Sequence, residues 1–129
     1  MIGILLITHY GLGNSLKQCA EHVFGPDIPA LAVLGIEKAD DPDQKIEEAK
    51  EILTSLNADA GVLVLTDLFG ATPANIAKQL TQINNVHCIS GVNLPMLIRS
   101  VSYRHLPMPE LIDKAISGAH DGIIAIKAD

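Results

Sequence analysis

The chain has 129 residues, of which 48% are hydrophobic but only 3% are Phe, Tyr or Trp. This length predicts a single domain, residues 1–129, with an aliphatic core built from Leu, Ile, Val and Ala. The formal net charge is −6, from 15 acidic and 9 basic residues, which argues against non-specific nucleic-acid binding because that binding needs a basic surface.

The N-terminal residues and the two cysteines indicate a soluble, cytoplasmic protein. The N-terminus lacks the basic region and the cleavage site of a signal peptide, and no apolar run approaches the length of a membrane span. Cys19 and Cys88 have no zinc-type or CxxC spacing. One falls on the apolar stripe of a predicted helix and the other in a predicted strand, so we expect both to be buried thiols.

Short apolar runs alternate along the chain with segments of helical periodicity, which is typical of an α/β domain with a mostly parallel sheet. The predicted strands cover residues 2–7, 30–36, 60–66, 86–89 and 123–126. The predicted helices begin after the loop 8–14, at Asp41-Pro42, at Thr72-Pro73, near residue 94 and near residue 111. Asp41 and Thr72 are expected to be N-caps, each followed by proline at the first helical position.

This order of elements fits a doubly wound sheet with strand order 2-1-3-4. In such sheets, ligands and chemistry gather at the carboxyl ends of the strands, where the strand order reverses. His9 follows the first predicted strand and Asp67 follows the third. We therefore expect the two side chains to lie close together.

A carboxylate that accepts a hydrogen bond from the His9 Nδ1 would leave Nε2 free as a nucleophile and would stabilise charge on the ring. The alternative is structural: His9 could simply bond to the backbone, and Asp67 could be an ordinary turn residue. The turn Gly70-Ala71-Thr72 delivers a helix N-terminus nearby, which suits a phosphoryl group, although any doubly wound fold has several such turns.

Other chemical signals are weak. The pair of glycines at Gly11 and Gly13 lacks the third glycine of a dinucleotide-binding loop. The remaining histidines are scattered without metal-ligand spacing, so we predict no metal site and no cofactor; they are His22, His87, His105 and His120.

Three blocks of the sequence resemble the mannose-class enzyme IIA (EIIA) family of the bacterial phosphoenolpyruvate-dependent phosphotransferase system (PTS). They are the opening Ile2-Gly-Ile-Leu-Leu-Ile-Thr-His9, the segment Gly61-Val-Leu-Val-Leu-Thr-Asp67-Leu-Phe-Gly-Ala-Thr-Pro-Ala-Asn75, and Ser90-Gly-Val-Asn-Leu-Pro-Met96-Leu. The blocks occur in the family's order and spacing, and the resemblance spans essentially the whole chain.

The resemblance implies a phosphoryl carrier without a cofactor. His9 would accept a phosphoryl group from the phosphocarrier protein HPr and pass it to a IIB component, with Asp67 orienting the ring. Gly70, Ala71 and Thr72 would hold the phosphoryl oxygens. The implied partner surface comprises Tyr10, Leu12, Phe69, Asn93 and Met96, with simple packing as the alternative for Leu12, Phe69 and Met96.

The family also implies a homodimer in which the last strand, about residues 122–126, crosses to the other subunit as an antiparallel edge strand. Membrane IIC and IID subunits would associate only through IIB, and sugar specificity would lie in them. The chain departs from the family pattern at Tyr10, where the family usually has Gly, and at Ala71-Thr72, where it frequently has Gly-Ser.

Three other functions stay open at this point. The phosphorylation state of His9 could be read by a regulatory partner rather than used for transport. His9 and Asp67 could be structural residues of a binding domain outside the PTS. A small hydrolase is the third, but the chain has no nucleophile motif for one.

Overall fold

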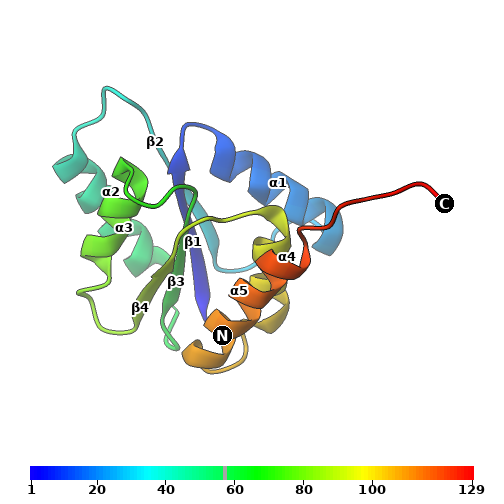
Figure 1. The fold of residues 1–129 in the computed structure, drawn as a ribbon. Coiled ribbons are helices and arrows are strands. Elements are labelled where there is room, and N and C mark those ends of the chain that lie inside the picture. The colour runs from blue at the N-terminus through cyan, green and yellow to red at the C-terminus, as the bar shows by residue number, and fades with distance from the viewer. Residues whose placement is uncertain (57) are drawn as a thin grey trace.

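The computed structural model describes residues 1–56 and 58–129 (Figure 1). The described residues form the strands β1 (Gly3–His9), β2 (Leu31–Ile36), β3 (Val62–Thr66) and β4 (Val86–Ile89). They also form the helices α1 (Leu12–Phe24), α2 (Pro42–Leu56), α3 (Thr72–Leu80), α4 (Leu94–Tyr103) and α5 (Met108–Asp121).

The strands form one parallel sheet in the order β2-β1-β3-β4, which confirms the predicted order. In the register, Ile7 of β1 lies opposite Leu34 of β2 and Thr66 of β3. The carboxyl ends of β1 and β3 are therefore neighbours at one edge of the sheet, so His9 and Asp67 emerge side by side.

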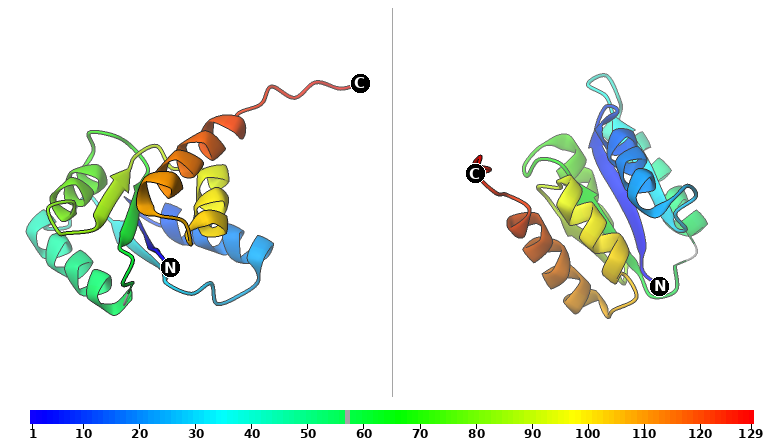
Figure 2. Two further views of the ribbon diagram at one scale, coloured as in Figure 1. Left: turned by 90° about the horizontal axis from the view of Figure 1, so that it is seen from below. Right: turned by 90° about the vertical axis from the view of Figure 1, so that its right-hand side faces the viewer.

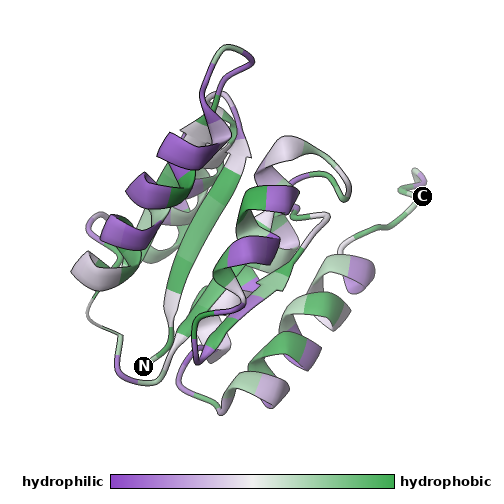
Figure 3. Ribbon diagram, turned by 90° about the vertical axis from the view of Figure 1, so that its left-hand side faces the viewer, coloured by the Kyte–Doolittle hydropathy of each residue, from purple (hydrophilic) through white to green (hydrophobic). Residues whose placement is uncertain are grey.

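Helices cover both faces of the sheet (Figure 2). On one face, Ile4 and Leu6 of β1 pack with residues of α1, α4 and α5. On the other face, Leu5 and Ile7 pack with residues of α2 and α3. Because β1 and β3 are buried on both faces, their residues form uninterrupted apolar runs rather than alternating ones. Figure 3 shows the hydrophobic strands between helices of mixed polarity.

Helix α1 begins earlier than the sequence predicted and presents a different face to the core. Its first turn packs directly on the strands, since the Gly13 N–H donates to Thr8 Oγ1 over 2.8 Å and a side chain at Gly13 would collide with Val33. Ala20 is buried, whereas Cys19, one position and about 100° around the helix away, is exposed. The prediction of a buried Cys19 is therefore wrong.

The other cysteine lies where the sequence predicted, within a strand. Cys88 is in β4 and is partly buried rather than fully enclosed, because β4 is an edge strand of the sheet. Burial raises the pKa of the Cys88 thiol to about 11, so this thiol is protonated at neutral pH and is a poor nucleophile.

The predicted starts of α2, α3 and α4 differ from the observed starts by at most one residue, whereas α5 begins at Met108, about three residues before its predicted start. Helix α2 begins at Pro42, and the Asp41 carboxylate accepts a hydrogen bond from the Asp43 N–H over 3.1 Å, as an N-cap does. Helix α3 includes Thr72, and its N-cap is Ala71, so the prediction that Thr72 is the N-cap is wrong. Ala71 has the extended backbone of a cap residue but only a methyl group with which to fill that position.

The structure does not confirm the predicted C-terminal edge strand. Residues 122–129 leave α5 and extend away from the domain (Figure 1). Ile123, Ile124 and Ile126 are all strongly exposed. A strand exists only where its backbone pairs with a neighbour, and within the described part of this single chain the segment has no such neighbour.

Candidate functional site

His9 and Asp67 form a hydrogen-bonded pair at the carboxyl ends of β1 and β3. The His9 Nδ1 lies 2.8 Å from the Asp67 Oδ2. The Asp67 side chain is only 12% exposed, whereas the His9 side chain is 43% exposed. The carboxylate therefore lies beneath the ring, and the ring faces solvent.

Two main-chain donors fix the carboxylate. The His9 N–H donates to Asp67 Oδ2 over 3.0 Å, and the Leu68 N–H donates to Oδ1 over 3.0 Å. Burial alone would raise the pKa of the Asp67 carboxyl, but the hydrogen bonds from the His9 backbone and ring, together with the charge interaction, lower it below its usual value. Asp67 is therefore ionised at neutral pH.

An ionised carboxylate can only accept hydrogen bonds, so the proton of a neutral His9 ring resides on Nδ1. The lone pair then resides on Nε2, at the far side of the ring from Asp67. This tautomer is the one required for a nucleophilic imidazole whose positive charge is stabilised from behind.

The turn from β3 into α3 presents helix N–H groups next to this pair. Gly70 has a φ of +84°, a conformation that glycine adopts without steric cost. The first N–H groups of a helix have no partner within the helix, and the Ala71 side chain cannot supply one. Thr72 lines the same cavity as His9, so the positive end of α3 borders the site.

That cavity has a volume of about 410 Å³ and lies between the ends of β1 and β2 and the start of α3. Its lining residues are His9, Tyr10, Ile36, Glu37, Lys38, Asp40, Pro42 and Thr72. The cavity lies beside the exposed His9 ring and is open to solvent. A phosphoryl group and a side chain of a partner protein can therefore both reach the ring there.

Tyr10 has an unusual backbone conformation, with a φ of +46°. Such a value is rare for a bulky residue and costs roughly 1–3 kcal/mol. It is stabilised by the Tyr10 N–H, which donates to the Ile36 carbonyl over 3.0 Å. Gly35 makes room for it, since a Cβ there would lie 2.5 Å from the Tyr10 carbonyl oxygen.

The structure divides the predicted partner surface into exposed and buried residues. Tyr10, Leu12 and Phe69 are exposed. Leu68, which the sequence reasoning missed, is exposed beside Phe69. The sequence did indicate that Leu68 is exposed, because it lies in a loop between Asp67 and the Gly70 turn, where no strand or helix face packs against the core.

Met96 is buried rather than exposed, and the partly exposed Asn93 has a structural role of its own. Met96 is only 3% exposed and is part of the core between the sheet, α4 and α5. Asn93 is the N-cap of α4: its side-chain oxygen accepts from the Met96 N–H over 2.9 Å, and its Nδ2 donates to the Ala119 carbonyl over 3.2 Å. For Met96 the packing alternative is therefore correct, and the assignment to a partner surface is wrong.

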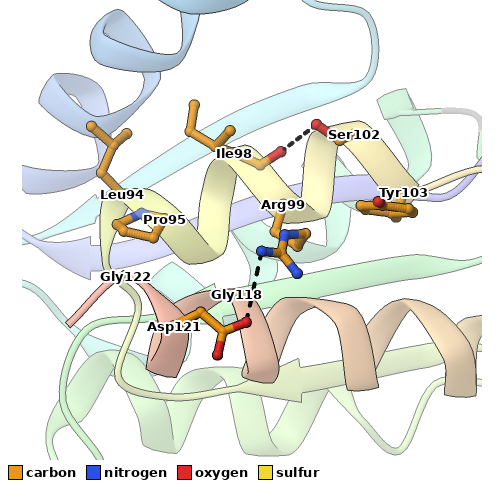
Figure 4. Close-up of a pocket in the computed structure, with 9 residues that line it drawn as sticks. All are labelled: Leu94, Pro95, Ile98, Arg99, Ser102, Tyr103, Gly118, Asp121 and Gly122. Atoms are coloured by element: carbon orange, nitrogen blue, oxygen red, sulfur yellow. Dashed lines mark hydrogen bonds and ion pairs between the residues drawn. The ribbon is translucent and has the colours of Figure 1, made fainter. Parts of the chain in front are cut away.

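Another cavity, of about 800 Å³, lies between α4 and α5 (Figure 4). Arg99 Nη2 is 4.0 Å from Asp121 Oδ2 there, and the Ser102 hydroxyl donates to the Ile98 carbonyl over 2.9 Å. None of the predicted site residues lines this cavity. Because the Ser102 hydroxyl donates its proton to a backbone carbonyl rather than to a base, Ser102 is not activated as a nucleophile.

Within residues 1–56 and 58–129, no three His, Cys, Asp or Glu side chains lie close enough together to hold a metal ion. None of the helices in the same ranges has both the length and the apolar character needed to cross a membrane.

Solved structures share this fold. An EIIA component of a phosphotransferase system from Streptococcus agalactiae superposes with a TM-score of 0.86 and 24% identity, over 97% of each chain. A mannose/sorbose-specific IIA subunit from Enterococcus faecalis superposes with a TM-score of 0.88 and 20% identity, over 99% of this chain and 96% of that one.

Curated relatives are similar in sequence. A fructose-specific EIIA component of Bacillus subtilis strain 168 is 30% identical, over 91% of this chain and 82% of that protein. A mannose-specific EIIAB component of Escherichia coli K12 is 28% identical over 98% of this chain, but the chain spans only 40% of that protein's length.

The model of the EIIA-man family, described as the PTS system fructose IIA component, matches residues 3–116. This range contains the whole sheet, the His9–Asp67 pair and most of α5. The chain therefore belongs to the EIIA-man family of phosphotransferase-system IIA components.

Proposed function

We propose that this protein is a phosphoryl carrier of a sugar phosphotransferase system, with His9 as the acceptor. One observation carries the proposal: in a chain of the EIIA-man family, an exposed imidazole is held by a buried carboxylate 2.8 Å from its Nδ1. The arrangement leaves Nε2 as the nucleophile and needs no metal or cofactor.

In the proposed reaction, the Nε2 lone pair of His9 attacks the phosphorus of a phosphohistidine on HPr. The new Nε2–P bond forms as the P–N bond to the donor imidazole breaks, and the donor nitrogen takes that electron pair. The His9 proton stays on Nδ1, where the Asp67 carboxylate stabilises the positive charge that develops on the ring. Transfer to a IIB component repeats the step with His9 as the leaving group.

The N-terminus of α3 would stabilise the phosphoryl oxygens. The N–H groups of Gly70 and Thr72 lie at the positive end of the helix dipole, and such groups bind anions without a charged side chain. The Ala71 N–H already donates to the Leu68 carbonyl over 3.3 Å, so it would have to exchange that bond for one to a phosphoryl oxygen. Phosphoryl transfer depends mainly on positioning and on charge stabilisation, and these are the two properties that the ring, the carboxylate and the turn supply.

We further propose that the protein is a homodimer through exchange of its C-terminal segment. Residues 123–126 are extended and apolar, and β4 is an open edge of the sheet. Deletion of residues 122–129 should reduce the mass measured by light scattering to that of a monomer. A dimer that survives this deletion would contradict the exchange.

The test of the carrier function is phosphorylation with phosphoenolpyruvate, enzyme I and HPr, followed by intact mass and an acid-lability assay. The wild type should gain one acid-labile phosphate, and His9→Ala should gain none. His22→Ala is the matched control, because His22 is an exposed histidine on α1, and it should be phosphorylated like the wild type.

The outcomes separate the functions left open by the sequence. An uncharged wild type beside fully charged HPr would contradict the carrier function and favour a structural His9–Asp67 pair. If the phosphate forms, a purified IIB protein should discharge it. A phosphate that forms readily but that no IIB removes would favour the regulatory function instead.

A further inference from the structure

Two of the chain's four Phe and Tyr side chains lie on the loops that carry His9 and Asp67. Tyr10 follows His9 and is 55% exposed, and Phe69 is two residues after Asp67 and is 85% exposed. Aromatic side chains are enriched in protein–protein interfaces, where they bury a large area at a low cost in conformational entropy. The rim around His9 therefore has the composition of a contact surface.

Tyr10 is held in place at both ends. Its N–H is bound to the Ile36 carbonyl, and its hydroxyl oxygen accepts from the Lys38 N–H over 3.4 Å. The ring thus spans from the end of β1 to the loop after β2. These two hydrogen bonds hold it there although a φ of +46° is unfavourable for the Tyr10 backbone. A side chain that is already ordered loses little entropy when a partner contacts it.

The ring also lies where a donor protein must come. His9 and Tyr10 line the same cavity, together with Pro42 and Thr72. Transfer between two histidines requires the donor's phosphorus to come within bonding distance of His9 Nε2, with both nitrogens roughly in line. The donor's surface must therefore cover the rim of the cavity, of which the exposed part of Tyr10 is a part.

We propose that Tyr10 determines the specificity of His9 for its protein phosphoryl donor. Its ordered ring is the contact that recognises an apolar surface beside the phosphohistidine of that donor. The inference rests on the proposed carrier function, because it assigns a role in a transfer that only a phosphorylated His9 performs.

The experiment compares two donors of the same phosphoryl group. Initial rates are measured with phospho-HPr over a range of concentrations and with phosphoramidate, a small donor that has no surface to dock. Tyr10→Gly removes the ring and accepts the positive φ without strain, so the variant should fold. Tyr10→Phe keeps the ring and removes only the hydroxyl.

With phospho-HPr, Tyr10→Gly should raise KM about tenfold, which is the effect of removing an interface anchor, and kcat should change much less. With phosphoramidate, the loss of kcat/KM in Tyr10→Gly should be about tenfold smaller than the loss with phospho-HPr. Tyr10→Phe should restore most of the wild-type kcat/KM. Phe24→Ala, which removes an exposed ring at the far end of α1, is the control.

Three results would overturn the inference. A KM for phospho-HPr that is unchanged in Tyr10→Gly would show that the donor does not use the ring. Equal losses with both donors would show that Tyr10 positions His9 rather than the donor, and an increase in kcat/KM would show that the ring only obstructs. If the wild type accepts no phosphate from HPr, both the carrier function and this inference fail, whereas an active wild type with an unaffected Tyr10→Gly variant contradicts the inference alone.

Discussion

The carboxyl ends of β1 and β3 contrast with the carboxyl end of β4, although all three carry sequence blocks that resemble the same family. At β1 and β3, the polar residues His9 and Asp67 bind each other and the ring faces solvent. After β4, the polar Asn93 binds backbone groups and caps α4, and Met96 is buried. The blocks at the ends of β1 and β3 thus present an exposed imidazole that is held by a carboxylate, whereas the block after β4 caps a helix and fills the core.

The first prediction concerns Asp67→Asn, for which we expect the largest effect. Asn keeps the shape and one acceptor oxygen but lacks the charge that stabilises the His9 ring, and its amide can present a donor to Nδ1 and so favour the wrong tautomer. The rate of His9 phosphorylation by phospho-HPr should fall about 100-fold or more. An unchanged rate in rapid-quench measurements would rule out the orienting role.

The second is Met96→Ala, which tests whether the β4 end is scaffold. Truncation of a buried methionine should lower the free energy of unfolding by about 2–5 kcal/mol, as measured by urea denaturation. Phe69→Ala is the matched control on the other side of the comparison, and its effect on stability should be below about 0.5 kcal/mol because the ring is exposed.

At a temperature where both Met96→Ala and the wild type are folded, their rates of phosphorylation should agree. A slower transfer by Met96→Ala without a loss of stability would show that Met96 contributes to partner binding rather than to the core.

The smallest effect concerns pH. The folded pKa of Asp67 lies below its usual value, so the ionised carboxylate contributes stability that is fully present above the unfolded pKa of about 3.9. This contribution is lost as the pH falls through the lowered folded pKa. The difference in unfolding free energy between wild type and Asp67→Asn should therefore shrink below about pH 4, and a difference that stays constant down to the acid transition would contradict the assigned ionisation.

Much of the fold could be predicted because both faces of the sheet are buried. Strands such as β1 and β3 are then continuous apolar runs that stand out from the periodic helices between them. Their order could be predicted from the usual winding of such sheets, and the pairing of His9 with Asp67 follows from that order. The first residue of α3 could not be predicted correctly, because its N-cap, Ala71, has no side chain that can cap a helix.

Burial of individual side chains was harder to predict. Cys19 and Ala20 are adjacent in sequence and both fit an apolar stripe, but only the docking angle of α1 on the strands decides which one faces the core. Met96 is apolar beside a predicted site, and its burial depends on α5, which packs against α4 from further along the chain. The conformation of Tyr10 likewise depends on Gly35 of a different strand.

The local structure of this protein can be read from its amino-acid sequence alone: which segments are strands and helices, and which strand ends carry an imidazole and a carboxylate. These properties follow from periodicity and from turn chemistry over a few neighbouring residues. Tertiary packing places the imidazole 2.8 Å from the carboxylate, buries Met96 in the core and holds the Tyr10 ring beside His9. Each of these depends on contacts between segments that are remote in sequence, whose relative placement is settled by packing across the sheet.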